Sequence, residues 1–158
     1  MIMFRNMRRK GQQLTIDECE EILISQPRGV LALLGDYDYP YALPMSHVYV
    51  NGKIYFHGAQ KGHKNDAVMN HSKCSYCVMD DGVKANDNWW YTFKSVIAFG
   101  NIKTLTDKDE KIEALTYLGD KFFPTHEETV DEINRLLERT EVFEITIDHM
   151  TGKVVQEK

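Results

Sequence analysis

The dipeptide Asn51-Gly52 constrains the fold of this 158-residue chain more than any other feature. It lies between the apolar runs 41–50 and 53–57, and both of its residues tolerate the positive φ angles of a type I′ turn. The two runs are therefore predicted to pair as an antiparallel hairpin. In that hairpin His57 lies beside the residues around Met45 and Ser46.

Other segments extend this pattern. Strand-length apolar runs recur at 30–34, 73–80, 89–105 and 142–147, and a turn at 150–152 leads into a short last strand over 153–156. Helices are predicted over about 15–25, 63–70, 107–121 and after Thr125; Thr15 and Glu18 form a capping box at the start of the first. Turns and short helices connect the strands, which favours a mainly β antiparallel barrel with peripheral helices. We expect one domain over 1–158 with a basic N-terminal arm at 1–12.

Composition narrows the function classes. The net charge is −5, so binding of nucleic acid through bulk electrostatics is not expected. No apolar run approaches the ~20 residues that span a bilayer, and three cysteines are an odd number that agrees with a reducing compartment. We expect a cytoplasmic protein. The basic cluster at Arg5, Arg8, Arg9 and Lys10 is either a solvated arm or an arm that folds over an anionic ligand.

The stretch 54–66 poses the main functional question. An apolar strand ends at His57, passes through a glycine-containing loop, and begins a helix near His63 and Lys64. Free N–H groups and the helix dipole favour an anion at such a helix start. Lys64 is unfavourable there in isolation but fits a site that holds a phosphate. The alternative is an ordinary surface turn with an exposed lysine, and neither a dinucleotide-binding nor a Walker-type glycine pattern is present.

The sequence gives little support for a metal site or for a catalytic nucleophile. His71, Cys74 and Cys77 have zinc-like spacing, but the cysteines lie three residues apart in a predicted strand and point to opposite faces. We therefore predict no metal site and assign no catalytic side chain, since no serine elbow or cysteine–histidine pair is evident. The aromatic run 89–93 is typical of a core or of a subunit interface.

Taken in order, these motifs carry a family resemblance. The strand 29–33, the segment 39–44, the hairpin 48–59 and Gly62-His63-Lys64 resemble the flavin-binding split-barrel proteins of the pyridoxamine 5′-phosphate oxidase-like superfamily. Within it the chain is most similar to the nitroimidazole-resistance branch, over about residues 8–155. The resemblance implies a six-stranded antiparallel Greek-key split barrel of the FMN-binding type, and a homodimer with FMN at the interface.

The resemblance also implies which residues hold the flavin. The second strand would lie along the isoalloxazine ring and offer backbone hydrogen bonds, through Leu43, Pro44, Met45, Ser46 and His47. Phe56 and His57 would flank the ring and the ribityl chain, and His63 and Lys64 would hold the phosphate. Trp90 and Ser95 are the residues expected from the partner subunit.

The implied activity is that of an FMN-dependent oxidoreductase. A nicotinamide or another donor would reduce the flavin, which would pass electrons to a small organic acceptor such as a nitro-aromatic. Oxidation of pyridoxamine phosphate itself is not expected, because no arginine follows Arg139 in this sequence, whereas that enzyme has a late basic site. The alternative is a non-enzymatic flavin- or haem-binding protein of the same fold, with His47, His57 or His63 as an iron ligand.

Overall fold

The computed structural model describes residues 4–156. Within this range there are eight strands: β1 (Arg28–Leu34), β2 (Pro40–Ser46), β3 (Val48–Val50), β4 (Lys53–Ala59), β5 (Lys73–Met79), β6 (Val83–Lys84), β7 (Tyr91–Thr104) and β8 (Thr140–Gln156). The same residues contain four α-helices: α1 (Ile16–Ser25), α2 (His63–Asn70), α3 (Lys108–Phe122) and α4 (His126–Leu136). Short 3₁₀ turns lie at η1 (Lys10–Gln12), η2 (Asp36–Asp38) and η3 (Leu137–Arg139).

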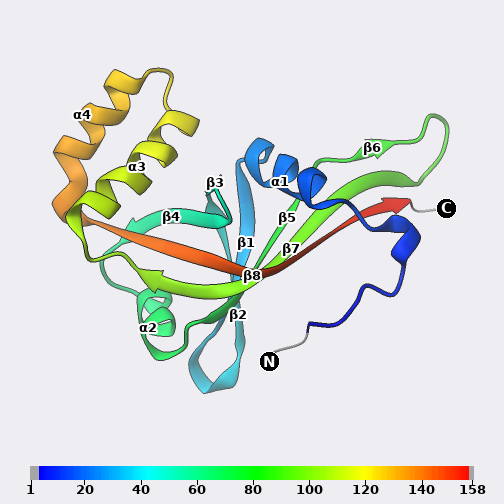
Figure 1. Ribbon diagram of the computed structural model, residues 1–158, viewed down its shortest axis with the longest axis horizontal. Helices are drawn as coiled ribbons and strands as arrows, with labels where there is room; N and C mark the ends of the chain where they lie inside the picture. Colours follow the sequence, from blue (N-terminus) through cyan, green and yellow to red (C-terminus); the bar gives the residue numbers. More distant parts are fainter. Residues whose placement is uncertain (1–3, 157–158) are drawn as a thin grey trace.

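All eight strands belong to one curled antiparallel sheet (Figure 1). Its order is β2-β1-β5-β7-β8-β4-β3, with β6 paired to β7 outside this path. β2 and β3 are therefore the two ends of the sheet, although they adjoin in sequence. The mainly β split-barrel prediction is confirmed, but eight strands replace the predicted six because short β3 and β6 also form ladders.

Local sequence signals determined several elements as predicted. Asn51 and Gly52 have φ angles of 47° and 80°, and Val50 pairs with Lys53 across the turn. Thr15 caps α1: its hydroxyl accepts the Glu18 N–H at 3.2 Å, and the Glu18 carboxylate accepts the Thr15 N–H at 2.8 Å. These signals act through neighbouring residues alone, so they need no tertiary contact to specify the structure.

Two strand boundaries differ from the prediction. The run 41–50 is interrupted at His47, whose side chain is drawn into the core. In contrast, the turn predicted at 150–152 does not form, and β8 runs without interruption to Gln156. A register shift between Phe99 and Gly100 allows the long β7–β8 ladder to bend. Gly152 stays within the strand, where a Cβ would contact Leu14 at 3.0 Å.

The concave side of the sheet holds the main core. Its fully buried members come from most of the strands and include Leu31, Tyr76, Phe56, Phe143 and Ile145. The helix α1 adds Cys19, Ile22 and Leu23 to this core. Burial of these large side chains supplies most of the driving force for folding, at roughly 1.5–3 kcal/mol for each.

The helices α3 and α4 form a hairpin that lies over the outer face of β4 and β8 at one end of the molecule (Figure 1). A second small core beneath this hairpin contains Leu105, Ala114 and Val142. In the part of the chain that the structure describes, no helix combines the length and the apolar character needed to cross a membrane.

Candidate functional site

A cavity of about 250 Å³ lies between the helical hairpin and the ends of two strands. Ser46 at the end of β2 and His57 on β4 line one wall. The helical walls are mostly apolar, and consist of Leu115, Leu118, Gly119, Phe122, Phe123, Ile133, Leu136 and Leu137, with Thr129, Glu132 and Thr140 as the polar members. This arrangement, an apolar cleft with a few converging polar groups, is characteristic of small-molecule sites.

Close packing of α3 on α4 shapes the back of this cavity. Thr129 is fully buried, and its side chain occupies the space that a Cβ at Gly119 would need. The Thr129 hydroxyl is satisfied locally, donating to the Thr125 carbonyl at 3.4 Å. Gly119 therefore allows the two helices to approach near their connection, and the side chains farther along them enclose the cavity.

His57 supplies the cavity's titratable nitrogen atoms. Partial burial against the helical hairpin lowers the pKa of His57, and the nearby Lys64 ammonium lowers it further. Glu132 acts in the opposite direction on the same pKa. His57 is therefore neutral at pH 7, and its ring can donate one hydrogen bond and accept another.

Two backbone hydrogen bonds that flank the β1–β2 ladder show which backbone groups of β2 face β1 and which face away from it. The N–H of Gly35 donates to the Tyr39 carbonyl at 2.8 Å, and the N–H of His47 donates to the Pro27 carbonyl at 3.2 Å. Both bonds join odd-numbered residues across the β1–β2 ladder. Backbone N–H and C=O groups of successive residues point to alternate sides of a strand. The even-numbered residues of β2 therefore turn their N–H and C=O groups away from β1, toward the other edge of β2.

That other edge of β2 has no neighbouring strand among the described residues. Of its even-numbered positions, Pro40 and Pro44 have no N–H group, so the donors that remain are those of Ala42 and Ser46. The Ser46 residue also lines the cavity. The end of β2 thus offers a backbone donor and acceptors at the cavity that His57 also lines. The predicted hairpin forms only between β3 and β4, because β2 pairs with β1 instead.

Lys64 lies at the start of α2 and turns toward β4. Its Nζ atom lies 4.9 Å from the centre of the buried Phe143 ring and occupies the space where a Cβ at Gly58 would lie. Burial lowers the pKa of Lys64. Among residues 4–156, no carboxylate lies within ion-pair distance of this ammonium, so a half-buried cation is left available for an external anion.

The neighbouring His63 points elsewhere. Its ring stacks on Tyr41 with centroids 4.1 Å apart, and its Nε2 accepts the Asp36 N–H at 3.4 Å. The structure therefore directs His63 to the β1–β2 connection and Lys64 to β4. Successive residues of a helix diverge by about 100°, which is the reason the predicted basic pair does not point at one place.

The predicted ring-binding residues divide between the two faces of the sheet. Phe56 is fully buried and packs near Phe143, and Leu43 and Met45 pack against the core. These three therefore present no side chain to the cavity. Pro44 lies on the opposite, exposed face of β2.

His47 is also held inside the protein. Its Nε2 lies 2.8 Å from the Leu23 carbonyl, and its Nδ1 lies 3.0 Å from the Tyr76 hydroxyl. Burial lowers the pKa of His47 to about 4, so the ring is neutral at pH 7. With both nitrogen atoms engaged, His47 is not free to ligate iron.

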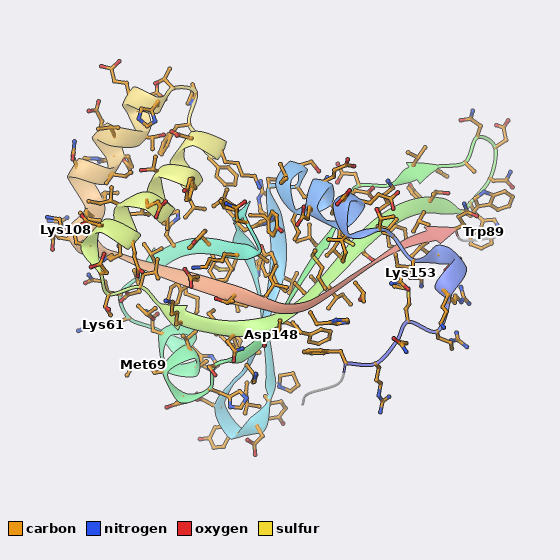
Figure 2. The ribbon with its side chains drawn as sticks, viewed as in Figure 1. Lys61, Met69, Trp89, Lys108, Asp148 and Lys153 are labelled. Carbon is orange, nitrogen blue, oxygen red and sulfur yellow. The ribbon has the colours of Figure 1, made fainter. Side chains whose placement is uncertain are left out.

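Trp90 and Ser95 lie far from the cavity. They belong to the arm formed by β6, the loop after it and the start of β7. This arm lies at the end of the molecule that is opposite the helical hairpin (Figure 1). Figure 2 shows the adjacent Trp89 at one extreme, while Lys61 and Lys108 lie at the other. Within one chain these residues therefore cannot contribute to the cavity.

Cys74 and Cys77 confirm the strand argument made from the sequence. Cys74 is buried in the core, whereas Cys77 lies half-buried on the outer face. In the described part of the chain, no group of three histidine, cysteine or acidic side chains is placed to hold a metal ion.

Sequence reasoning missed the helical wall of the cavity. The sequence predicts helices over about 107–121 and after Thr125, but it does not indicate that their apolar residues line a cavity, and Thr140 and Glu132 belong to no recognisable motif. One available signal was an excess of large apolar residues near Pro124, where Phe122 and Phe123 extend the apolar series beyond one helical face.

Comparisons with known proteins support the fold of the chain. The family model described as pyridoxamine 5′-phosphate oxidase matches residues 15–154. No curated protein matches the chain.

Solved structures share the fold. A proposed 5-nitroimidazole antibiotic resistance protein from Bacteroides thetaiotaomicron has a TM-score of 0.76 at 18% identity, over 91% of this chain and 87% of that one. An FAD-binding protein from Mesorhizobium loti has a TM-score of 0.69 at 22% identity, over 91% and 97%. An FAD- and haem-binding protein from Mycobacterium smegmatis has a TM-score of 0.75 at 21% identity, over 93% and 74%.

Proposed function

The chain belongs to the pyridoxamine 5′-phosphate oxidase family, and from this premise we propose that it is an FMN-dependent oxidoreductase that reduces a small organic acceptor. The observation that carries the proposal is Lys64, a half-buried cation with no carboxylate partner among the described residues. A partly desolvated charge of this kind is costly unless an anion neutralises it. The phosphate of FMN is such an anion.

The cradle around Lys64 fits a phosphate. The absence of a side chain at Gly58 makes room for the ammonium itself, and Gly62 precedes α2 without a side-chain cap. No side chain therefore accepts from the first N–H groups of that helix, although the N–H groups of Asn65 and Asp66 donate to the Gly62 carbonyl. Lys64 and this helix start supply two kinds of donor for a doubly charged group.

The end of β2 fits the polar edge of a flavin ring. The Ser46 N–H and the carbonyl groups of the same edge offer the mixed donors and acceptors that a pyrimidine edge requires. When bound, the flavin would supply the electron chemistry, so the protein needs no nucleophile. The task of the chain's own residues is to bind, to orient and to exclude water.

The cavity beneath α3 and α4 is the proposed acceptor site. Its apolar walls exclude water, and His57 and Ser46 place hydrogen-bonding groups at one end. A volume of about 250 Å³ lies just below the usual range of ligand pockets and suits a molecule of one or two rings. A nitro-aromatic of that size is the acceptor we favour, and the similar fold of the 5-nitroimidazole resistance protein supports this choice.

A haem-binding role has weaker support. His47 has both ring nitrogens engaged, and His63 stacks on Tyr41 and accepts from Asp36. His57 is the histidine among the three candidates that retains an open approach. A flavin site therefore explains more of the arrangement than an iron site.

A pair of lysine variants tests the proposal. FMN affinity is measured by quenching of flavin fluorescence for the wild type, Lys64→Ala and Lys61→Ala. Loss of a charge-assisted contact costs about 1.5–3 kcal/mol, so Lys64→Ala is expected to weaken binding roughly tenfold to a hundredfold. The exposed Lys61, in the same loop, serves as the control and should change affinity less than twofold. Equal affinities for all three proteins would remove Lys64 from the site.

A further inference from the structure

We propose that Tyr76 is a positioning residue that holds the end of β2 in place and so aims the Ser46 N–H at the ligand. The inference deepens the proposed function and rests on it for the identity of the ligand. The orientation of the end of β2 by Tyr76 does not depend on which ligand binds, so it can be tested in the ligand-free protein.

Tyr76 belongs to β5 yet reaches β2, two strands away. Its hydroxyl donates to the Met45 carbonyl at 2.8 Å. Gly29 on the intervening β1 makes this possible, because a Cβ there would lie 2.7 Å from the Tyr76 ring. Gly29 is also the register partner of Met45. The tyrosine thus passes beneath β1 at the one residue that leaves room for it.

This contact lies where the β1–β2 ladder ends. Beyond Met45, the next hydrogen-bonded pair is His47 and Pro27, in which the His47 N–H donates to the Pro27 carbonyl. Proline has no N–H, so the His47 carbonyl receives no hydrogen bond in return. The end of β2 is therefore held by one ladder bond fewer than its middle. The fully buried Tyr76 supplies an additional contact from the core side at this point.

His47 extends the same set of contacts to α1. The Leu23 carbonyl can only accept, so the His47 Nε2 carries the proton and donates to it at 2.8 Å. The unprotonated Nδ1 then accepts from the Tyr76 hydroxyl at 3.0 Å, which shares its single hydrogen between this nitrogen and the Met45 carbonyl. The two rings meet edge to face with centroids 5.1 Å apart. Tyr76 is therefore fixed on both sides, by His47 and by the Met45 carbonyl.

The consequence concerns the Met45–Ser46 peptide. In a trans peptide the carbonyl and the following N–H point in opposite directions. The ladder turns the Met45 carbonyl toward β1 and the Tyr76 hydroxyl holds it there, so the Ser46 N–H points to the free edge of β2. Ser46 also lines the cavity. Tyr76 never touches the ligand in this account, and acts only through the orientation of that peptide.

Amide exchange in the ligand-free protein tests the positioning directly. The variant Tyr76→Phe keeps the ring and removes the hydroxyl, and Tyr49→Phe is the matched control, because the Tyr49 hydroxyl bonds Glu20 on α1 rather than β2. The protection of the His47 amide is compared with that of Ala98 in the centre of the sheet. Tyr76→Phe should lower this ratio about tenfold, and Tyr49→Phe should leave it within twofold.

FMN titration provides the second measurement. The Kd should rise about tenfold in Tyr76→Phe, with a shifted spectrum of the bound flavin, and stay within twofold in Tyr49→Phe. An unchanged exchange ratio in Tyr76→Phe overturns the positioning role, whatever FMN does. If the wild type binds no FMN, the proposed function fails, and the exchange ratio still decides the role of Tyr76. Should Tyr76→Phe not fold, His47→Gln loosens the same hydroxyl and should lower the ratio in the same direction.

Discussion

At the scale of single residues, Lys64 and His47 are two titratable side chains whose surroundings disfavour the charged form. Lys64 is half-buried near an aromatic ring, and His47 is fully buried between Leu23 and Tyr76. The two cases differ in their partners. His47 has both nitrogen atoms satisfied as a neutral ring, whereas the Lys64 ammonium has no carboxylate partner among the described residues. The first is a structural group, and we propose that the second is a binding group.

The buried His47 predicts a pH dependence of stability. Its pKa is about 4 in the folded protein, against 6.5 ordinarily, so the unfolded chain binds more protons between these values. Stability is therefore complete above about pH 6.5 and falls as the pH decreases toward 4. From pH 7 to pH 5 the free energy of unfolding should drop by roughly 2 kcal/mol on account of this residue.

Urea unfolding at the two pH values measures this drop. The variant His47→Gln cannot titrate, so its own decrease between pH 7 and pH 5 should be smaller than that of the wild type by the same roughly 2 kcal/mol. If both proteins lose equal stability, acid acts through other groups and the account of His47 is wrong.

At the scale of elements, local chemistry made several parts of the fold predictable. The Asn51-Gly52 turn and the Thr15–Glu18 cap depend only on adjacent residues, and both form as expected. The continuity of β8 was not predictable, because it depends on a bend shared with β7 and on packing around Gly152. Residue patterns report local preference, and ladder continuity is a property of two strands together.

The site was less predictable than the fold. Spacing placed Ser46 near His57, and glycine and lysine together indicated an anion site. Spacing could not show that Phe56 points into the core, since adjacent residues on a strand face opposite sides and either side could have held the ligand. The contribution of α3 and α4 depends on how the helices dock, which no local pattern encodes.

The helical wall of the cavity predicts a selective effect on the acceptor. Leu136→Trp on α4 should fill the cavity and weaken binding of 2-methyl-5-nitroimidazole at least tenfold, while FMN affinity stays within twofold. Val130→Trp is the control, because Val130 is on the same helix, is 41% exposed and does not line the cavity.

Equilibrium dialysis of the nitroimidazole against each FMN-loaded protein provides the comparison. A result in which both tryptophan variants retain full nitroimidazole affinity would place the acceptor outside this cavity. Loss of FMN from Leu136→Trp alone would instead show that the cavity holds part of the flavin.

At the scale of the whole molecule, one face of the sheet is apolar and exposed. Alternate residues of β1, β5 and β7 point away from the core, and the exposed ones include Val30, Leu34, Met79, Ile97 and Phe99. Register places Val30, Cys77 and Ile97 in one row across the three strands. A contiguous apolar surface of this kind marks an interaction site. We infer that a second copy of the chain covers it, which would also let Trp90 and Ser95 approach a partner's cavity.

Ile97→Lys should therefore dissociate the dimer. Sedimentation equilibrium should give the wild type a mass of about twice the 18.3 kDa of one chain. Ile97→Lys should have about the mass of one chain, because a lysine buried at such an interface loses its hydration. Ile16→Lys serves as the control, because Ile16 is 55% exposed on α1, away from this face, and should leave the mass unchanged. A wild type that sediments as a single chain would contradict the inference.

The most direct test of the central claim is an absorption spectrum of the wild-type protein after incubation with FMN and removal of unbound ligand by desalting. The account predicts that the two visible bands of oxidised flavin remain with the protein, at close to one FMN per chain, and that they bleach when a reductant is added. A protein that leaves the column colourless would contradict it, because Lys64, Gly58 and the edge of β2 would then be arranged for some other anion or for none.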